Sequence, residues 1–261
     1  MEKTPSSPPL TDYLSRTADY LAAITRLFGD YKRRTFSALQ IQPGQRMLDA
    51  GCGTGDDLIA LARHLGPAAE LHGIDVSPEL IERARARAEA EKLPLHFEVM
   101  DLLTPRFPPA SFHRIRCDRV FQHLPEPAAA LRTLVALTCP GGLILVADVD
   151  WTSLRVEHPD PATTALILDA QRKVVPSPDS GRKLHTLFHH AGLADIETHA
   201  ETICITDPGV ALFVTGLGTI LDHLRQTGAL PSEAADAWLR DAGQPGFFCS
   251  LTGYMTHGRV P

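Results

Sequence analysis

Apolar residues recur along the first part of the chain at steps of three and four, which is the spacing of one face of a helix. The pattern extends over residues 10–40 and stops at the breaker sequence Gln42-Pro43-Gly44. Residues 1–9 are polar and rich in proline and serine. We therefore predict an N-terminal helix over residues 10–40, preceded by a flexible leader over residues 1–9.

The apolar pattern then switches repeatedly between short strand-like segments and amphipathic helical ones. Ser77 followed by Pro78 indicates a helix start, because a serine side chain caps the first turn and proline fits its first position. The expected strands are 46–49, 70–75, 95–100, 112–118 and 143–149, and the expected helices are 56–65, 78–92 and 127–137. Such alternation predicts an α/β fold with a parallel sheet and helices on both faces.

Beyond residue 149 the alternation loosens, and prolines surround the next helical segment. The expected elements are helix 162–174, helix 182–191, strand 196–205, a helical stretch over 207–240 and a closing strand over 247–259. We predict one domain over residues 10–261, in which residues 151–180 and 206–245 are helical insertions.

Composition and charge narrow the class of protein. The chain has 261 residues, a formal net charge of −6 and no basic stripe, which argues against a nucleic-acid-binding surface. Its five cysteines are scattered without a CxxC pair, which argues against a disulfide framework and a cysteine zinc site. No apolar run approaches the length of a membrane span, and the polar start is unlike a signal peptide. We expect a globular, cytoplasmic protein.

The sequence LDAGCGTGDD, residues 48–57, carries the strongest chemical signal in the chain. Its alternating glycines lie between a predicted strand and a predicted helix, where they let the backbone turn sharply and let a ligand approach it. A dinucleotide site needs the spacing G-x-G-x-x-G and places a pyrophosphate at the helix N-terminus. Asp56 and Asp57 stand there instead, with Asp49 just ahead of the turn. The pattern therefore favours a ligand with positive charge and no phosphate.

The segment Asp49–Gly55 resembles the first motif of class I S-adenosylmethionine-dependent methyltransferases, D/E-x-G-x-G-x-G. Further landmarks of that family follow in order, namely Asp75 in LHGIDVS, Asp101 in EVMDLL, the segment CDRVFQHL and the strand entry LTCPGGLILVADVD. The resemblance covers residues 22–150, continues in GRKLHTLFHHAGL, and is closest to the small-molecule branch of menaquinone- and ubiquinone-biosynthesis-like and natural-product enzymes. It implies a Rossmann-like, seven-stranded, mostly parallel sheet with helices on both faces, an N-terminal helix and helical cap insertions on the substrate side.

The same resemblance implies S-adenosylmethionine as the cofactor. By that resemblance Asp75 binds both ribose hydroxyls, and Asp101 lies beside the adenine amino group. Arg34 pairs with the cofactor carboxylate, the alternative being an exposed helix arginine. The expected cofactor-binding residues are Arg34, Asp49, Gly51, Cys52, Gly53, Gly55, Asp75, Val76, Asp101, Leu102 and Cys117.

Methyl transfer requires that the acceptor be aligned and, where the acceptor carries a proton, that a base receive it. His123, just after the fourth strand, is the candidate base, and packing or a backbone hydrogen bond is its alternative role. Tyr20 of the N-terminal helix is the second catalytic candidate, with plain packing as its alternative. The candidate substrate residues are Tyr13, Asp150 and Trp151, of which the last two follow the fifth strand at the ligand edge.

We expect methyl transfer to a small, apolar or aromatic acceptor such as a quinone or a secondary metabolite. The apolar residues of the second insertion fit either such an acceptor or ordinary helix packing; they are Phe213, Leu217, Ile220, Leu221 and Leu224. No metal site is expected, because His185 and His189, four residues apart on a predicted helix, have no evident third ligand.

Other functions remain as alternatives. A protein of the same fold can bind the cofactor without transferring methyl, as a cyclase or a non-catalytic partner. A nicotinamide dehydrogenase fits Asp75 but not Asp56. An RNA or DNA methyltransferase is opposed by the net charge and by the lack of an Asn/Asp-Pro-Pro-Tyr/Phe sequence after the fourth strand. The expected partner is a small-molecule substrate, without nucleic acid or a membrane span, and the oligomeric state is open, homo-oligomers included.

Overall fold

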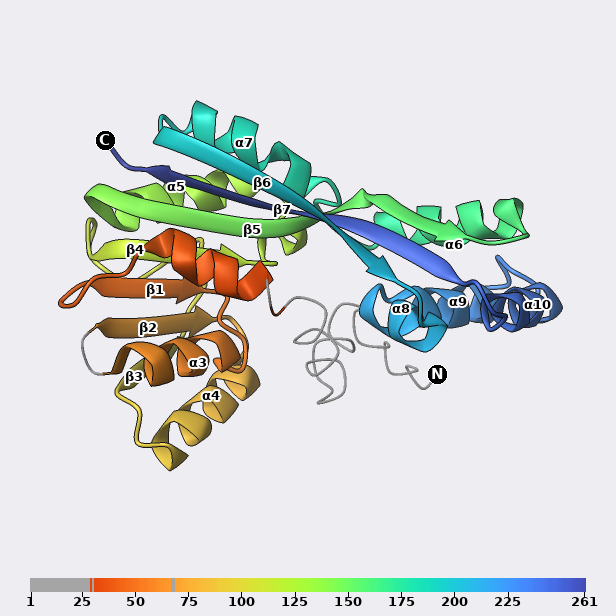
Figure 1. Cartoon of the computed structure of the whole chain (residues 1–261), viewed down its shortest axis with the longest axis horizontal. Helices are drawn as coiled ribbons and strands as arrows, with labels where there is room; N and C mark the ends of the chain where they lie inside the picture. The colour runs from red at the N-terminus through yellow and green to blue at the C-terminus, as the bar shows by residue number, and fades with distance from the viewer. Residues whose placement is uncertain (1–28, 30, 67–68) are drawn as a thin grey trace, which may run out of the picture. The chain divides into compact units, whose positions relative to one another are not determined.

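The computed structural model describes residue 29, residues 31–66 and residues 69–261. A helix over residues 31–39 opens this part of the chain, and strands and helices then alternate (Figure 1). The elements of the alternating region are β1 (Arg46–Ala50), α3 (Asp56–Leu65), β2 (Glu70–Asp75), α4 (Pro78–Ala90), β3 (Leu95–Val99), β4 (Phe112–Asp118), η2 (Phe121–His123), α5 (Pro127–Leu137) and β5 (Thr138–Glu157). The later elements are α6 (Pro161–Lys173), α7 (Ser180–His190), β6 (Ala194–Ile205), α8 (Pro208–Val214), α9 (Leu217–Gln226), α10 (Ser232–Ala242) and β7 (Phe248–Arg259). The predicted leader and most of the predicted N-terminal helix lie outside the described residues.

Helix starts follow the local chemistry of the sequence. Ser77 accepts a hydrogen bond from the Leu80 N–H at 3.3 Å, and Pro78 takes the first helical position, as predicted. Asp160 and Asp207 cap α6 and α8 in the same way, each just before a proline. These local signals explain why the predicted helix starts agree closely with the observed ones.

The strands β1 to β7 form one sheet in the order β3-β2-β1-β4-β5-β7-β6. β1 to β5 pair in parallel. β7 is antiparallel to β5, because Val260 exchanges backbone hydrogen bonds with Gly141 and Gly142 near the start of β5, whereas the Thr252 N–H donates to Ser153 further along it. The arrows of Figure 1 show this reversal. The predicted Rossmann-like, seven-stranded, mostly parallel sheet is thus confirmed.

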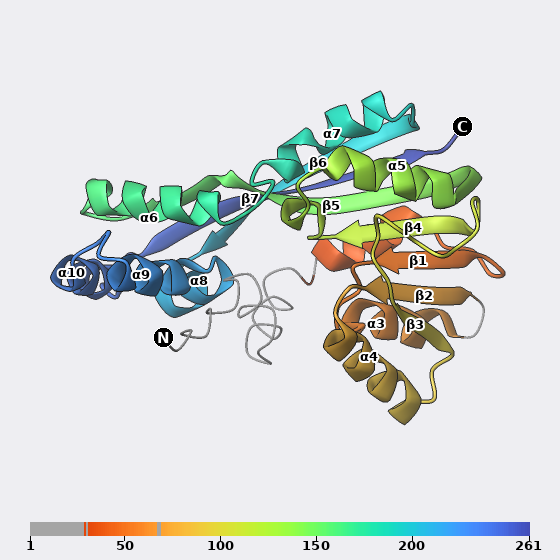
Figure 2. The same ribbon diagram turned by 180° about the vertical axis from the view of Figure 1, so that it is seen from behind.

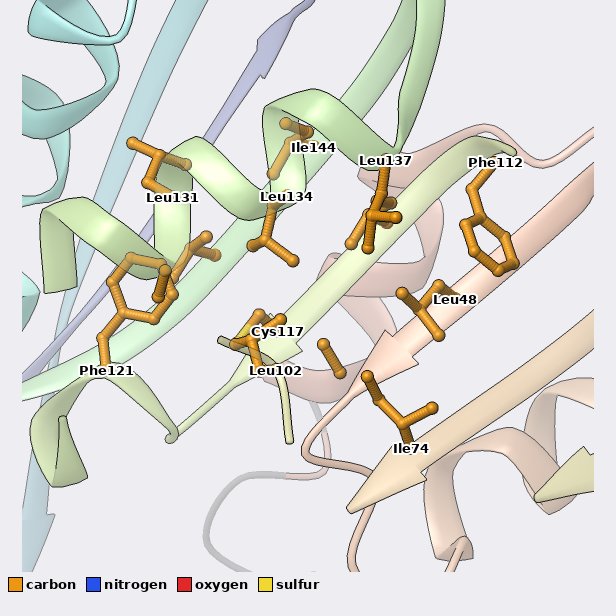
Figure 3. Close-up of a cluster of buried hydrophobic side chains, with 14 of the residues drawn as sticks. Leu48, Ile74, Leu102, Phe112, Cys117, Phe121, Leu131, Leu134, Leu137 and Ile144 are labelled. Carbon is orange, nitrogen blue, oxygen red and sulfur yellow. The ribbon is translucent and has the colours of Figure 1, made fainter. Parts of the chain in front are cut away.

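Helices cover both faces of the parallel part of the sheet (Figures 1 and 2). Met47 of β1 packs into a core with α3, α4 and the helix of residues 31–39. Its neighbour Leu48 packs into the opposite core, with α5 and α7, and Figure 3 shows that core around Phe112 and Leu134. Burial on both faces explains why these strands read as nearly continuous apolar runs.

β5 is 20 residues long, whereas the sequence predicts a strand only over 143–149. The Pro140-Gly141-Gly142 sequence lies inside the strand and not in a turn before it, because both glycines pair with Val260. A register shift opposite β4, between Phe112 and Arg114, absorbs the irregularity. At its other end the strand continues past Trp151, which the sequence places at the strand end.

The helical stretch predicted over 207–240 consists of the three helices α8, α9 and α10. Gly216, with a φ of +75°, separates the first two, and Pro231 precedes the third. Four of the five side chains offered as an acceptor surface are buried, which favours the packing interpretation for them: Leu217, Ile220, Leu221 and Leu224 are at most 6% exposed. The fifth, Phe213, is half-buried.

The chain divides into two compact units. The core unit comprises Asp30–Asp150, Asp179–Glu201 and Gly253–Pro261, and the insertion unit includes Trp151–Pro178 and Thr202–Thr252. β5, β6 and β7 each contribute residues to both units. The two predicted insertions fall mainly in the insertion unit, and the prediction of one domain over residues 10–261 stays a prediction. Within the part of the chain that the structure describes, every helix is too short or too polar to cross a membrane.

The insertion unit has its own buried centre at Trp238 of α10, which is 1% exposed. The indole N–H donates to Thr164 Oγ1 of α6 at 2.9 Å. The indole ring stacks on His158 with the ring centroids 4.6 Å apart, and His158 Nε2 lies 3.0 Å from the Trp238 carbonyl oxygen. This aromatic pair ties α10 to the segment ahead of α6.

Candidate functional site

The candidate site lies at the carboxyl ends of the parallel strands of the core unit, the edge at which ligands bind in open α/β sheets (Figure 1). The glycine turn follows β1, Asp75 ends β2, Asp101 follows β3 and Asp118 ends β4. These four strands are consecutive neighbours in the sheet, so the fold brings residues from four separate segments to one edge.

The three glycines of the turn after β1 all have positive φ, but they have different structural roles. A Cβ at Gly51 would lie 2.2 Å from Val120 Cγ2, and one at Gly55 would lie 2.6 Å from Phe97 Cζ. A Cβ at Gly53 would meet no atom of the described residues within 4 Å. The outer glycines therefore allow the chain to pack against itself, and the middle glycine leaves the backbone open to a ligand.

Asp75 joins the glycine turn to the end of β2. Its Oδ2 accepts from the Gly53 N–H at 3.0 Å, and its Oδ1 accepts from the Ser77 N–H at 2.9 Å. Each carboxylate oxygen keeps a second lone pair, so the side chain can still accept two hydroxyl hydrogen bonds in a fixed orientation. The neighbouring Val76 is 66% exposed, an apolar surface next to these acceptors.

The other predicted cofactor residues differ in exposure. Asp101 is exposed, and its Oδ1 accepts from the Leu103 N–H at 2.8 Å. Leu102, Cys52 and Cys117 are at most 9% exposed, so their side chains belong to the hydrophobic cores. Burial raises the pKa of the Cys117 thiol well above its ordinary value, which keeps it protonated and unreactive.

Arg116 of β4 is fully buried, and three of the acidic side chains at this edge contact it. Its guanidinium lies 3.1 Å from Asp49, 2.9 Å from Asp57 and 2.6 Å from Asp118. Its Nε donates to Thr35 Oγ1 in the helix of residues 31–39 at 3.1 Å. One side chain thus connects the end of β1, the start of α3 and the end of β4.

This arrangement separates the pKa values of two neighbouring acids. Burial raises the pKa of Asp49 to about 6, against the attraction of Arg116. Burial also acts on Asp57, but Arg116 and Lys32 outweigh it and hold the pKa at about 2. Burial opposes the charge of Arg116 itself, yet the three carboxylates raise its pKa well above the ordinary value. Asp57 and Arg116 therefore remain charged at neutral pH.

The charge argument from the sequence needs a correction here. Asp57 pairs with Lys32 at 2.8 Å as well as with Arg116, and Asp56 pairs with Arg87 at 2.7 Å. The acids at the start of α3 are neutralised by basic side chains, so they repel a phosphate less than the sequence implies. The sequence does not single out these bases, because their contacts come from distant segments.

Asp148 of β5 organises the turn that carries His123. The fully buried Asp148 carboxylate accepts from the backbone N–H groups of Gln122 at 2.7 Å and Val149 at 2.9 Å. Burial raises the pKa of Asp148 to about 7, against these hydrogen bonds. His123 keeps an exposed face, yet burial of the rest of the ring and the charge of Arg119 lower its pKa. The imidazole is therefore neutral at neutral pH and can accept a proton.

Tyr31 lies on the helix of residues 31–39, the same helix whose Thr35 accepts a hydrogen bond from Arg116. Burial and then the charge of Asp118 raise the pKa of its hydroxyl well above the usual value, so the phenol remains protonated at neutral pH. The sequence assigns Tyr31 only to an apolar helix stripe. The tyrosines that it favours, Tyr13 and Tyr20, lie outside the described residues.

The remaining candidates have local partners. Arg34 forms an ion pair with Glu201 of β6, which favours its alternative role as an exposed helix arginine. Asp150 is 4% exposed, and its Oδ2 lies 3.8 Å from Arg182 Nε. Trp151 belongs to the insertion unit, where its backbone N–H donates to the Pro178 carbonyl at 2.7 Å.

The sequence does not identify Arg116, Asp118 or Tyr31 as site residues. One signal was available: arginine at an inward position of the strand sequence FHRIRCD requires acidic partners, because a buried charge must be paired. Which acids those are depends on the fold.

Comparison with known proteins identifies the family to which this geometry corresponds. The family model described as a methyltransferase domain matches residues 41–192. An uncharacterized 37.1 kDa protein of a Streptomyces fradiae transposon is 34% identical over 250 residues, covering 95% of this chain and 70% of that protein.

Relatives with named activities match over shorter stretches. The ubiquinone biosynthesis O-methyltransferase of Xanthomonas campestris is 34% identical over 42% of this chain and 45% of that enzyme. The aklanonic acid methyltransferase of a Streptomyces species is 34% identical over 51% of this chain and 60% of that enzyme. The chain thus matches less than two thirds of the length of either enzyme.

Two solved structures share the fold. Phosphoethanolamine N-methyltransferase 2 of Haemonchus contortus, in complex with S-adenosylmethionine, aligns with a TM-score of 0.62 and 17% identity over 99% of this chain and 62% of that one. The cyclase SpnF aligns with a TM-score of 0.57 and 18% identity over 89% of this chain and 81% of that one.

Proposed function

The chain belongs to the S-adenosylmethionine-dependent methyltransferases, and from that premise we propose that it methylates a small acceptor with an apolar or aromatic framework, of the quinone or secondary-metabolite kind. The names of the two enzyme relatives, a ubiquinone biosynthesis O-methyltransferase and an aklanonic acid methyltransferase, support a small-molecule acceptor. The observation that carries the proposal is the meeting of the glycine turn, Asp75 and the Asp148-held His123 turn at one edge of the sheet.

The residues of the glycine turn fit the family's cofactor. A Cβ added at Gly53 would have no atom of the described residues within 4 Å, and the Gly53 N–H orients the Asp75 carboxylate. We infer that Asp75 accepts hydrogen bonds from the two ribose hydroxyls, that Val76 covers one face of the adenine and that Asp101 accepts a hydrogen bond from the adenine amino group. Asp49 acts through Arg116, and the buried Leu102 and Cys117 act through their backbone.

When bound, S-adenosylmethionine supplies an electrophilic methyl group on a sulfonium. The chain's own residues then have two tasks. The Asp148 carboxylate holds the Gln122 N–H, which fixes the η2 turn and the position of His123. The neutral imidazole of His123 accepts the proton that an acceptor hydroxyl loses as its oxygen gains the methyl group. Arg116, remaining charged, holds the turns around the cofactor rigid.

The alternative is a protein of this fold that binds the cofactor without transferring methyl. The fold-level similarity to the cyclase SpnF shows that this architecture is shared by a protein named for another reaction. Formation of S-adenosylhomocysteine distinguishes the two functions, because only methyl transfer consumes the sulfonium.

The first experiment is a calorimetric titration with S-adenosylmethionine, S-adenosylhomocysteine and NAD. We expect the first two to bind and NAD not to bind. Asp75→Asn should weaken cofactor binding about a hundredfold, because one acceptor oxygen becomes an NH₂ donor and the other no longer belongs to a charged acceptor. Glu82→Gln is the matched control, since it removes one exposed negative charge of α4 and should leave binding unchanged.

The second part of the test identifies the acceptor class. Purified protein is incubated with S-adenosylmethionine and a panel of phenols, hydroquinones and polyketides beside transfer RNA, and S-adenosylhomocysteine is quantified. Turnover with a member of the small-molecule panel, reduced about a hundredfold or more in His123→Ala at unchanged cofactor affinity, supports the proposal. Cofactor binding without S-adenosylhomocysteine from any acceptor favours the alternative, and turnover with the RNA alone contradicts the proposed acceptor class.

A further inference from the structure

Two histidines and a glutamate meet on the outer pair of strands of the core unit. The hydroxyls of Thr198 on β6 and Thr256 on β7 lie 3.0 Å apart, and those of Thr202 and Thr252 lie 3.4 Å apart, which shows that the two strands are antiparallel and in what register. In that register His257 stands opposite Glu197, and His199 lies two residues further along β6 on the same face. Strand pairing therefore brings together side chains that are far apart in the sequence. Thr198 and Thr256, for example, are 58 positions apart.

The distances suit a metal ion. Glu197 Oε2 lies 3.6 Å from His257 Nε2 and 3.9 Å from His199 Nε2. One ligand atom from each of the three side chains lies within 4.8 Å of the others. Ligands of a tetrahedral zinc ion are about 3.3 Å apart, as their bond lengths require. The side chains of Glu197 and His199 are 66% and 64% exposed, so small rotations can close the remaining gap around the better-buried His257.

A cavity adjoins these three side chains. Its volume is about 590 Å³, and its lining includes Glu197, His199 and His257 together with Gln40 and Leu143. Leu143 pairs with Arg114 at the start of β4, so the cavity is displaced from the carboxyl ends of the strands, where the candidate cofactor residues lie. The positive charge of Arg259, which also lines the cavity, is offset by Asp195 at 3.7 Å, and its guanidinium donates to the Gly141 carbonyl.

A second cluster, formed by Glu70, His72 and His96, shows what a less suitable arrangement looks like. There the Arg46 guanidinium already lies 3.1 Å from Glu70, and the His72 and His96 rings stack with centroids 4.8 Å apart. A cation would have to displace the arginine.

We propose that Glu197, His199 and His257 bind one divalent first-row transition-metal ion of the Zn²⁺ class, with water in the open position that faces the cavity. Two imidazole nitrogens and one carboxylate oxygen are ligands that such ions prefer. The ion would cross-link β6, the edge strand of the sheet, to β7. The site is separate from methyl transfer and needs no part of the proposed function.

The test uses the untagged full chain, treated with EDTA and dialysed, and titrated with ZnCl₂ by calorimetry. We expect one ion per chain with a Kd of about 10 µM or tighter and a rise in the thermal midpoint of the metal-bound protein. Glu197→Gln and His199→Gln should each weaken binding about a hundredfold. Both side chains are exposed, so both variants should fold, which circular dichroism and S-adenosylmethionine binding check independently of the metal.

His96→Gln and His190→Gln are the matched controls, one from the second cluster and one from the end of α7. Both should bind zinc like the unaltered chain. The proposal is overturned by the absence of stoichiometric binding, by binding that survives in both Glu197→Gln and His199→Gln, or by binding that is lost in His96→Gln. Because the readouts are zinc affinity and thermal midpoint, failure here leaves the methyltransferase proposal untouched.

Discussion

Arg116 holds three segments of the candidate site together through its ion pairs. Its guanidinium is 1% exposed and contacts three carboxylates, of which Asp49 belongs to the strand before the glycine turn and Asp57 to the helix after it. Such a side chain stabilises the fold less than its contacts suggest, because burying charges is costly. Its removal, however, leaves acids buried without this counter-ion.

We expect Arg116→Met to lower the free energy of unfolding by about 3–5 kcal/mol, because buried carboxylates lose their counter-ion. Arg87→Met is the control: its pair with Asp56 is 2.7 Å long but about 40% exposed on both sides, and surface pairs contribute about 1 kcal/mol or less. Urea unfolding of both variants measures the difference. Equal losses of unfolding free energy in the two variants would show that the buried ion pairs of Arg116 stabilise the fold no more than an exposed pair does.

The turn between β1 and α3 contains one glycine needed for packing and one that leaves the backbone open to a ligand. Gly51 and Gly53 both have positive φ, +81° and +56°. A side chain at Gly51 would overlap Val120, whereas one at Gly53 would point into space free of atoms of the described residues. The two positions therefore separate the packing of the turn from its openness to a ligand.

Gly53→Ala should cost about 1–2 kcal/mol of stability from its left-handed backbone alone and weaken S-adenosylmethionine binding about tenfold or more, because the new methyl group occupies the ligand's approach. Gly51→Ala should destabilise the fold more, since its Cβ would lie 2.2 Å from Val120 Cγ2. Adding Val120→Ala should recover part of that loss. Thermal unfolding and calorimetry of the three variants test this. Unchanged cofactor affinity in Gly53→Ala would contradict the assignment of this turn.

At the scale of the whole molecule, the chain divides its residues between a core unit and an insertion unit. The candidate cofactor residues belong to the core unit, and the buried Trp238 belongs to the insertion unit. A defect confined to the insertion unit should therefore lower stability without changing cofactor binding.

Trp238→Ala should lower the free energy of unfolding by about 3–5 kcal/mol, because it leaves a large cavity and removes the hydrogen bond to the Thr164 hydroxyl. We expect cofactor affinity to stay within about twofold of the unaltered chain, because the candidate cofactor residues belong to the other unit. Leu166→Ala, at a side chain of α6 that is 39% exposed, is the control and should change neither. A loss of cofactor affinity greater than about twofold would show that cofactor binding depends on the insertion unit.

The sequence alone was sufficient for the order of the elements and for the class of ligand. The capped start of α4 at Ser77, the limits of α3 and the glycine turn are local features, set by the backbone preferences of a few adjacent residues. The resemblance carried by Asp75 and Asp101 also follows from short segments at strand ends, and the family match over residues 41–192 confirms it.

What only the tertiary structure decided depends on residues far apart in the chain. The length of β5 depends on its pairing with the distant C-terminal segment, from Val260 near the start of β5 to Thr252 near its end. The partners of Arg116 are set by strands and helices that converge on it. The Glu197, His199 and His257 cluster exists only in one register of β6 and β7. The physical reason is the same in each case: periodicity fixes which face of an element is buried, whereas strand register and side-chain direction fix which distant groups meet there.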